Sequence, residues 1–289
     1  MNEFIQQIVN GLVIGSTYAL LTIGLTMIYG LMGVLNYAHG ELYMLGGVIA
    51  YYAVEAMGCN FFLSIPLTMI SCMVFGMLIE RILIKRLYKA PIVTTAIVTI
   101  GLSIFLQNTI FLFWGSMPKT INSPFPLAPI NLAGIKVSSI RMFVLGVAVV
   151  AIVVTQIIIK KTRLGMALRA TFQDKDVAAM SGINTRLVYT LTFAYGSMLA
   201  GLAGMLCGSF LTISPFMGTQ QTNKAWAVAV MGGRGDIMGA IGSGFILGIV
   251  ETLGAGYISS AYKDAFSFII VVLVLVFKPN GLFSRNAKR

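Results

Sequence analysis

Long apolar runs alternate with short polar segments along almost the whole chain. A bilayer core takes about 20 apolar residues per helix, so each run can be counted as one membrane span. Eight spans are predicted in this way: Phe4–Met32, Leu42–Met57, Phe62–Ile79, Ile92–Trp114, Arg141–Ile159, Leu187–Ile213, Ala225–Gly256 and Ala265–Phe277. The pattern therefore predicts one all-α domain over residues 1–289, a polytopic transmembrane helical bundle.

Composition excludes a soluble protein of this size. Hydrophobic types make up 57% of the 289 residues and charged types only 10%, whereas soluble domains average about 45–50% and about 25%. So few charges cannot cover a surface that faces water. The three cysteines show no CxxC spacing and His39 is the only histidine, so we predict no metal site.

The net charge of +11 marks the topology of the chain rather than a nucleic-acid partner. Residues 1–80 contain no Lys or Arg, and most of the basic residues then cluster within 81–91, 160–186 and 278–289. Basic residues in short segments beside apolar spans mark cytoplasmic loops. We therefore predict that these three segments face the cytoplasm and that nucleic acid is not a partner.

If the three basic clusters are cytoplasmic, one of the predicted spans must turn back within the membrane. Spans four and five leave and return, which places the proline-containing loop Gly115–Ser139 outside. Span six leaves again, so the last span ends inside only if Ala225–Gly256 begins and ends outside. That segment must then be a re-entrant hairpin or two short helices, with its turn at Gly232–Asp236. About eight to nine crossings result.

The first half of the chain carries an interruption of its own. Asn36–Glu41 places amide, imidazole and carboxylate groups between two apolar runs. Irregular backbone at membrane depth is tolerated where it lines a cavity, so two broken or re-entrant segments point to a transport pathway. The N-terminus lies outside if Phe4–Met57 crosses twice and inside if it crosses three times. This stretch contains no basic residue, so the positive-inside rule cannot choose between the two positions. We favour the outside for the N-terminus.

The segment 160–186 is the longest polar stretch predicted on the cytoplasmic side. Its apolar residues recur at mostly helical spacing, at Leu164, Leu168, Phe172, Val177, Met180 and Ile183, with breaks at Gly165 and Gly182. A short amphipathic helix on the inner face of the membrane fits this pattern. The alternatives are a solvated loop and an interfacial anchor.

Four stretches of the chain are similar to motifs of one membrane-protein family. They are GLTMIYGLMGVLNYAHGELYMLGG (Gly24–Gly47), SIFLQN (Ser103–Asn108), VMGGRGDIMG (Val230–Gly239) and KPNGLF (Lys278–Phe283). In this order they resemble the permease subunits of bacterial high-affinity branched-chain amino-acid ABC importers. The segment 160–186 resembles the coupling segment of such permeases, which docks in a groove of the ATPase subunit, through Arg169, Ala170, Asp174, Ala178 and Gly182.

The resemblance implies an assembly in the bacterial inner membrane. Its other parts are a second, similar permease that completes a heterodimer, two cytoplasmic ATPases and an external solute-binding protein. It also implies that the ATPase partners bind ATP, so that this chain needs no cofactor and is not an enzyme. The residues agree, since a Walker A loop requires GxxxxGK[ST] and no Lys in this chain follows a Gly.

Six polar residues in the spans or between them are candidates for the substrate pathway: Asn36, His39, Glu41, Gln107, Asn108 and Glu251. Ionisable residues at membrane depth usually face protein or water. In one interpretation, Asn36, His39 and Glu41 bind the carboxylate and ammonium of an amino acid. In the other, they only satisfy the freed backbone of a broken helix. Gln107 and Asn108 also suit an interhelical hydrogen-bonding pair.

Two other classes of transporter stay open on the sequence alone. One is a secondary transporter driven by a proton or sodium gradient, with His39 and Glu41 as the relay. The other is a passive channel for urea or short amides. The energy source of uptake separates both classes from an ABC permease.

Overall fold

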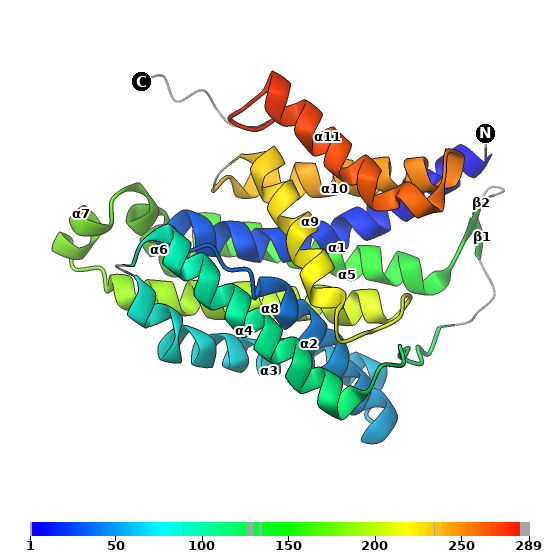
Figure 1. Ribbon diagram of the computed structural model, residues 1–289, viewed down its shortest axis with the longest axis horizontal. Helices are drawn as coiled ribbons and strands as arrows, with labels where there is room; N and C mark the ends of the chain where they lie inside the picture. Colours follow the sequence, from blue (N-terminus) through cyan, green and yellow to red (C-terminus); the bar gives the residue numbers. More distant parts are fainter. Residues whose placement is uncertain (1, 89, 126–129, 133–134, 234, 284–289) are drawn as a thin grey trace.

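The computed structural model describes residues 2–88, 90–125, 130–132, 135–233 and 235–283 (Figure 1). Its α-helices are α1 (Asn2–Met32), α2 (His39–Tyr51), α3 (Phe61–Ile82), α4 (Ile92–Trp114), α5 (Ser139–Lys161), α6 (Arg163–Gln173), α7 (Lys175–Met180), α8 (Thr185–Gly208), α9 (Met217–Gly232), α10 (Ile237–Tyr257) and α11 (Lys263–Phe277). Shorter turns are the π-helical Tyr52–Ala56 and the 3-10 turns Ile84–Leu87 and Ser260–Tyr262. The predicted helical membrane bundle is confirmed.

One short hairpin departs from the all-α prediction. It consists of β1 (Ile130–Leu132) and β2 (Ile135–Val137), which pair antiparallel with Ile130 opposite Val137. The hairpin lies within the loop Gly115–Ser139, which the sequence predicts to lie on the outside. The proline-containing part of that loop at 126–129 lies outside the described residues.

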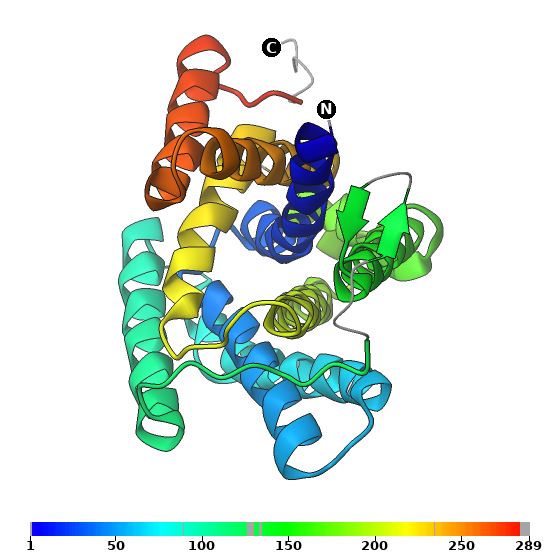
Figure 2. The same cartoon turned by 90° about the vertical axis from the view of Figure 1, so that its right-hand side faces the viewer.

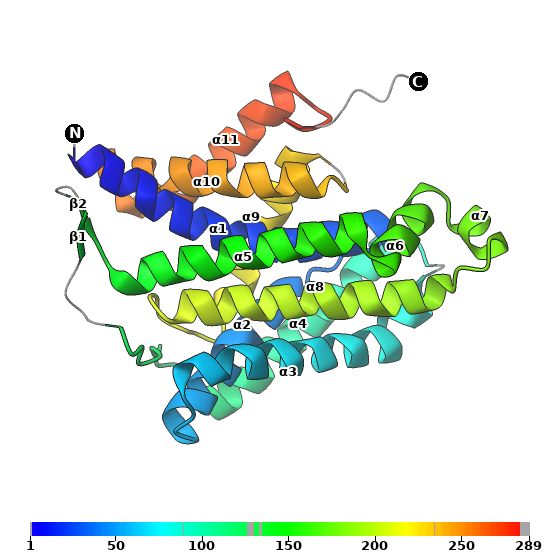
Figure 3. The same cartoon turned by 180° about the vertical axis from the view of Figure 1, so that it is seen from behind.

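Helices α1 and α8 form the centre of the bundle and are almost wholly buried. Figure 3 shows α10, α1, α5, α8 and α3 running alongside one another. The central helices touch through glycines, since a Cβ added to Gly24 of α1 would lie 2.6 Å from the carbonyl oxygen of Gly196 in α8. Small residues at such crossings let two membrane helices approach closely, which is how they pack without a hydrophobic driving force.

The outer helices present apolar surface to their surroundings. Among the described residues, seven helices are long and apolar enough to cross a membrane, and they begin at Glu3, Phe61, Ile92, Ser139, Thr185, Ile237 and Ser260. In α3, α4, α5 and α11, at most 28% of the most apolar stretch is buried. Leu, Ile, Val and Phe side chains dominate what remains exposed. A surface of this kind is suited to lipid.

The first break lies where the sequence predicts one, but begins three residues earlier than predicted. After α1, Gly33 turns the chain with a φ of +66°, and the backbone is non-helical from residue 33 to residue 38. His39 and Glu41, predicted to be part of the break, instead form the first turn of α2. The predicted helix start at Leu42 was too late because both polar side chains are buried within the protein.

The second break divides the predicted span Ala225–Gly256 into two helices, as one of the two alternatives requires. Between them the chain turns at residues 233–236, of which Arg234 lies outside the described residues. Asp236 caps α10 by accepting hydrogen bonds from the backbone N–H groups of Met238 and Gly239, at 2.9 and 3.1 Å. Helix α9 starts at residue 217, whereas the sequence predicted a start at residue 225. The predicted start was too late because the first two turns of α9 are polar.

The helix ends gather on two opposite sides of the bundle. In Figure 1, α6 and α7 lie on the left and the N-terminus and the hairpin lie on the right. The turn between α9 and α10 is on the α7 side, where Gly30 at the end of α1 packs against Gly235. Residues 278–283 reach the same turn, since the N–H of Leu282 donates to the carbonyl of Met231. We call this side the basic end.

The described parts of the three predicted cytoplasmic segments all lie at the basic end. The segment that follows α3 joins the start of α8, where Tyr88 packs edge-on against Tyr189. The N-terminus lies at the opposite end, as the favoured external position requires. The out-and-in order of the helices is therefore consistent with the predicted topology.

This topology predicts which positions an impermeant thiol reagent reaches in intact cells. Lys175→Cys, at the basic end, should be labelled only after the cells are permeabilised. Met117→Cys is the matched position at the opposite end, where Met117 is 77% exposed, and it should be labelled in intact cells. Both are made in a Cys59→Ala chain, because the other two cysteines are buried. Strong labelling at position 175 in intact cells would contradict the topology.

Candidate functional site

Helix α9 carries polar side chains on several sides, although it lies inside the bundle. Figure 2 shows α9 between α4 and α11. On one side, the hydroxyl of Thr222 accepts a hydrogen bond from the backbone N–H of Gly40 in α2. On another, Lys224 pairs with Glu251 of α10. Thr219 and Asn223 lie between these two sides and are exposed.

The first polar cluster is built around Glu41 in the first turn of α2. One carboxylate oxygen, Oε1, accepts hydrogen bonds from Ser103 Oγ and Gln107 Nε2 of α4, both at 2.8 Å. Gln107 also donates to Thr219 of α9. The carboxylate rests against Gly218, where a Cβ would lie 2.4 Å from Oε2. Four side chains from α2, α4 and α9 thus share one network, which is buried except at Thr219.

Asn36 and His39 are fully or almost fully buried, and each bonds to a backbone group. The side-chain oxygen of Asn36 accepts from the N–H of Ala38 in the first break, at 3.1 Å. His39 Nε2 lies 3.1 Å from the carbonyl oxygen of Leu21 in the middle of α1, which can only accept, so this nitrogen carries the proton. Among the described residues, Asn36 Nδ2 and His39 Nδ1 have no hydrogen-bond partner. The contacts favour the second interpretation for Asn36 alone, since His39 and Glu41 both reach other helices.

The predicted pair Gln107 and Asn108 divides between two faces of α4. Gln107 is buried and forms the interhelical bonds described above. Asn108 is exposed, and its amide donates to the carbonyl oxygen of Ile104 within the same helix. One residue along a helix turns the side chain by about 100°, so two neighbours cannot both face the bundle. Asn108 therefore does not join the other candidates.

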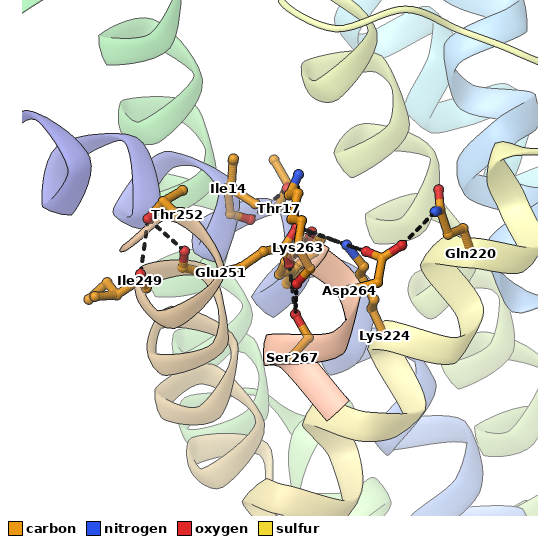
Figure 4. Close-up of polar contacts among 12 residues, drawn as sticks. Ile14, Thr17, Gln220, Lys224, Ile249, Glu251, Thr252, Lys263, Asp264 and Ser267 are labelled. Atoms are coloured by element: carbon orange, nitrogen blue, oxygen red, sulfur yellow. Dashed lines mark hydrogen bonds and ion pairs between the residues drawn. The ribbon is translucent and has the colours of Figure 1, made fainter. Parts of the chain in front are cut away.

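The second polar cluster surrounds Glu251 and ties four helices together (Figure 4). Glu251 Oε1 lies 2.8 Å from the ammonium of Lys224 in α9 and 2.8 Å from that of Lys263 at the start of α11. Tyr18 of α1 donates to the same carboxylate at about 3.0 Å, and Ser267 of α11 donates at 3.2 Å. Lys224 and Glu251 are both almost fully buried.

Asp264 completes this cluster and makes it electrically neutral. Its Oδ1 lies 2.8 Å from the ammonium of Lys224, and its Oδ2 accepts from Gln220 Nε2 at 3.0 Å. Two ammonium groups thus face two carboxylates. An isolated charge at membrane depth costs several kcal/mol, and pairing offsets most of that cost.

The sequence identified only Glu251 of this cluster. Lys224 stands one residue before the predicted span that begins at Ala225, and Lys263 and Asp264 stand just before the span that begins at Ala265. A signal was available: two lysines flank spans at the end predicted to be external, where the positive-inside rule disfavours them. Lysines that depart from that rule are candidates for buried ion pairs.

The predicted coupling segment folds into two short helices with defined caps. The Asp174 carboxylate caps α7 and accepts from the N–H groups of Asp176 and Val177, at 2.8 and 3.0 Å. These hydrogen bonds, with that from Val177 the stronger influence, hold the pKa of Asp174 below its usual range. At the other end, Gly182 has a φ of +83°. The N–H of Ile183 then reaches back five residues, which closes a Schellman motif.

The candidate coupling residues fall into two groups. Arg169 is engaged within the chain, because its guanidinium donates to the carbonyl oxygen of Ile159 at the end of α5. Ala178 is buried, as expected for a residue that holds α7 in place. Asp174 and Gly182 are exposed, and Ala170 is half-buried. Arg169 is nevertheless exposed, so its hydrogen bond holds α6 against α5 and leaves other N–H groups of the guanidinium free to meet a partner.

Phe172 joins the predicted coupling segment to the membrane helices. Its ring lies over two glycines: a Cβ on Gly30 of α1 or on Gly235 in the turn between α9 and α10 would come within 2.4 Å of the ring. A displacement of α6 would therefore press on α1 and on this turn together. No pattern in the sequence links these three residues.

Gly182 offers a test of the backbone at the end of α7. A Cβ at this position would meet no atom within 4 Å, so substitutions act through backbone conformation alone. A β-branched residue in the left-handed region costs about 1–2 kcal/mol. Gly182→Val should therefore loosen α7 and speed the exchange of its backbone amide hydrogens, whereas Gly182→Asn, which tolerates that region, should stay near wild type. Equal effects of Gly182→Val and Gly182→Asn would show that the left-handed backbone at this position is not the cause.

Comparison with known proteins gives a family match over most of the chain. The family model described as "Branched-chain amino acid transport system / permease component" matches residues 7–275. The chain belongs to this family. It is 37% identical over 98% of its length, and 96% of the relative's, to the high-affinity branched-chain amino acid transport system permease protein LivH of Escherichia coli. It is 36% identical, with the same coverage, to the permease protein BraD of Pseudomonas aeruginosa.

More distant permeases match part of the chain. The ribose import permease protein RbsC of Haemophilus influenzae is 28% identical over 45% of the chain and 42% of its own length. No solved structure shows a significant match. Membership confirms the resemblance seen in the four sequence motifs. The chain is a multi-pass membrane protein and a permease component of a transport system.

Proposed function

We propose that this chain is one of two permease subunits of an ABC importer that carries leucine, isoleucine and valine across the bacterial inner membrane. Its membership of the permease family, with LivH and BraD as relatives over nearly the full length, is the observation that carries the proposal. A second, similar permease completes the heterodimer. Two cytoplasmic ATPases supply the energy and an external binding protein delivers the amino acid.

The pathway runs along the exposed face of α9 in this proposal. Thr219 and Asn223 are exposed there, and amide and hydroxyl groups at membrane depth are costly in lipid. That face therefore contacts water or the second permease. The network of Glu41 and Gln107 supports α9 on one side and the network of Lys224 supports it on the other. Both clusters hold the wall of the pathway in place.

The coupling segment supports ATPases as the partners at the basic end. Met180 is 88% exposed and Val177 and Met166 are more than half exposed, on helices that project from the bundle (Figure 1). Exposed apolar side chains on a projecting segment mark a protein interface. In an ion-driven transporter this segment would connect two helices and would need no such surface.

Uptake by the reconstituted transporter tests the proposal. The chain is purified with its partner subunits, placed in lipid vesicles and given radiolabelled leucine with the binding protein outside. Uptake should require ATP on the ATPase side and should persist when ionophores remove proton and sodium gradients. Uptake that follows an ion gradient without ATP would instead identify a secondary transporter. Equilibration of urea or short amides without ATP would identify a channel.

A further inference from the structure

A cavity of about 490 Å³ lies at the end of the bundle opposite the basic end. Its walls come from α1, α9, the start of α11 and the loops before α9 and α11. Ser260 and Ala261 of the loop before α11 are exposed and border the cavity. A cavity at this end is where a solute arriving from the external side first meets the chain.

Charges of both signs line one side of this cavity. Lys263 and Asp264 at the start of α11 both border it, with 36% and 44% of their side chains exposed. Each side chain is held by an ion pair, since Lys263 pairs with Glu251 and Asp264 pairs with Lys224. An ammonium has three donors and a carboxylate has about four acceptor sites. Both groups therefore keep hydrogen-bonding capacity for a further ligand.

Gln221 adds an acceptor that nothing in the described chain uses. It borders the same cavity, and its side-chain oxygen is buried without a hydrogen-bond partner among the described residues. A buried polar atom left without a partner is uncommon and points to a ligand or water. Its oxygen can accept from an ammonium but cannot serve a carboxylate, which has no donor to offer.

The rest of the cavity lining mixes apolar and polar side chains. Ile14, Leu211, Phe216 and Met217 supply aliphatic or aromatic surface, and side chains with hydroxyl groups, such as Thr17, lie among them. A small molecule that carries a positive group, a negative group and a compact apolar side chain matches this lining. Ligand sites commonly place a few polar groups beside apolar surface, so that the polar groups fix the orientation of the molecule.

We propose that this cavity is a receiving site for the zwitterionic head of an amino acid, with Asp264 and Gln221 accepting from the α-ammonium and Lys263 donating to the α-carboxylate. The apolar part of the lining holds the aliphatic side chain. The proposal deepens the proposed function and rests on it for the class of substrate. It gives this permease its own recognition of the amino acid, beyond that of the binding protein.

Protection of a thiol at the rim measures this binding without transport. Ala261→Cys is introduced into the complete transporter in a chain with Cys59→Ala and Cys207→Ala, and an impermeant maleimide is added outside without binding protein. L-Leucine should slow labelling. Leucinol, which lacks the carboxylate, and 4-methylpentanoate, which lacks the ammonium, should protect only at roughly tenfold higher concentration or above.

Variants of Asp264 and Lys263 test whether each charged side chain binds the amino acid. Asp264→Asn and Lys263→Gln should each raise the half-protecting leucine concentration roughly tenfold. Gln221→Leu leaves the ion pairs intact and should raise it as well, which keeps the test valid if a charge variant misfolds. Lys175→Gln, at the basic end, is the matched control and should leave protection unchanged.

Uptake measured on the same preparations separates the two proposals. ATP-driven leucine uptake without any protection by leucine would overturn the receiving site and leave the importer assignment standing. Equal protection by leucine, leucinol and 4-methylpentanoate would also overturn it. Protection by leucine in a preparation that shows no ATP-driven uptake would support the site and refute the proposed function.

Discussion

Replacing Glu251 with glutamine is expected to destabilise the bundle by about 3 kcal/mol. The change leaves the buried ammonium of Lys224 facing only Asp264, with Lys263 adding a second positive charge beside it. Breaking a buried pair costs about 3–5 kcal/mol because the remaining charge is uncompensated, and Asp264 keeps this loss near the lower value. Helix α11, the least buried of the membrane-length helices, should loosen first. Thermal unfolding in detergent measures the loss.

Two further variants separate charge from packing in this cluster. Lys224→Met in the Glu251→Gln chain restores neutrality and should recover at least half of the lost stability, because contacting charges do not act independently. Glu55→Gln is the control, since Glu55 is an exposed carboxylate that accepts hydrogen bonds from Asn122. It should change stability by less than about 0.5 kcal/mol. A Glu251→Gln chain as stable as this control would refute the role of the cluster.

Gly30→Ala is expected to reduce uptake roughly tenfold or more while the chain still inserts at normal abundance. The added methyl group would lie 2.4 Å from the ring of Phe172 and 3.0 Å from Gly235, so the ring must leave its place over α1 and the turn. Overpacking of this kind costs about 1–3 kcal/mol. The coupling of ATP hydrolysis to transport should fall by more than this loss of stability explains.

The contact itself is tested by combining changes. Phe172→Leu gives a smaller side chain that leaves room for the methyl group, so Gly30→Ala should cost little in that background. Non-additivity of this kind is the signature of direct contact. Gly146→Ala in α5 is the control, because a Cβ there meets no atom within 4 Å. Fully additive losses in the two-residue combination would show that Phe172 does not transmit the motion.

The sequence predicted the membrane-length helices well because length and hydropathy alone decide them. The six predicted spans other than Leu42–Met57 and Ala225–Gly256 all correspond to helices of the structure, and the turn between α9 and α10 lies at its predicted position. The starts of α2 and α9 were missed for a common reason. Each helix begins with polar groups whose hydrogen-bond partners lie on other helices. For example, the hydroxyl of Thr222 in α9 accepts from the backbone N–H of Gly40 in α2. Such tertiary contacts leave no mark in local hydropathy.

The candidate site was predicted less completely. Glu41, Gln107 and Glu251 could be found because each is a polar residue within or between apolar runs, and all three are buried in networks. Lys224 and Asp264 were missed because they stand at the edges of runs, where charges are ordinary. The contact of Phe172 with Gly30 joins residues far apart in the chain. Only a three-dimensional arrangement reveals it.

The charge of Asp174 gives the most direct test of the central claim, that α6 and α7 dock on an ATPase. Asp174 also caps α7, so two controls are needed: Asp174→Asn, which removes the charge and keeps the cap, and Asp174→Ala, which removes both. A reversed charge in a fitted interface is strongly unfavourable.

The measurement is substrate-stimulated ATP hydrolysis, with leucine uptake, by the assembled transporter at matched abundance. The account predicts that Asp174→Arg abolishes both activities, that Asp174→Asn retains them, and that Asp174→Ala loses only a part. Normal hydrolysis and uptake by the Asp174→Arg transporter would contradict the docking of this segment on an ATPase.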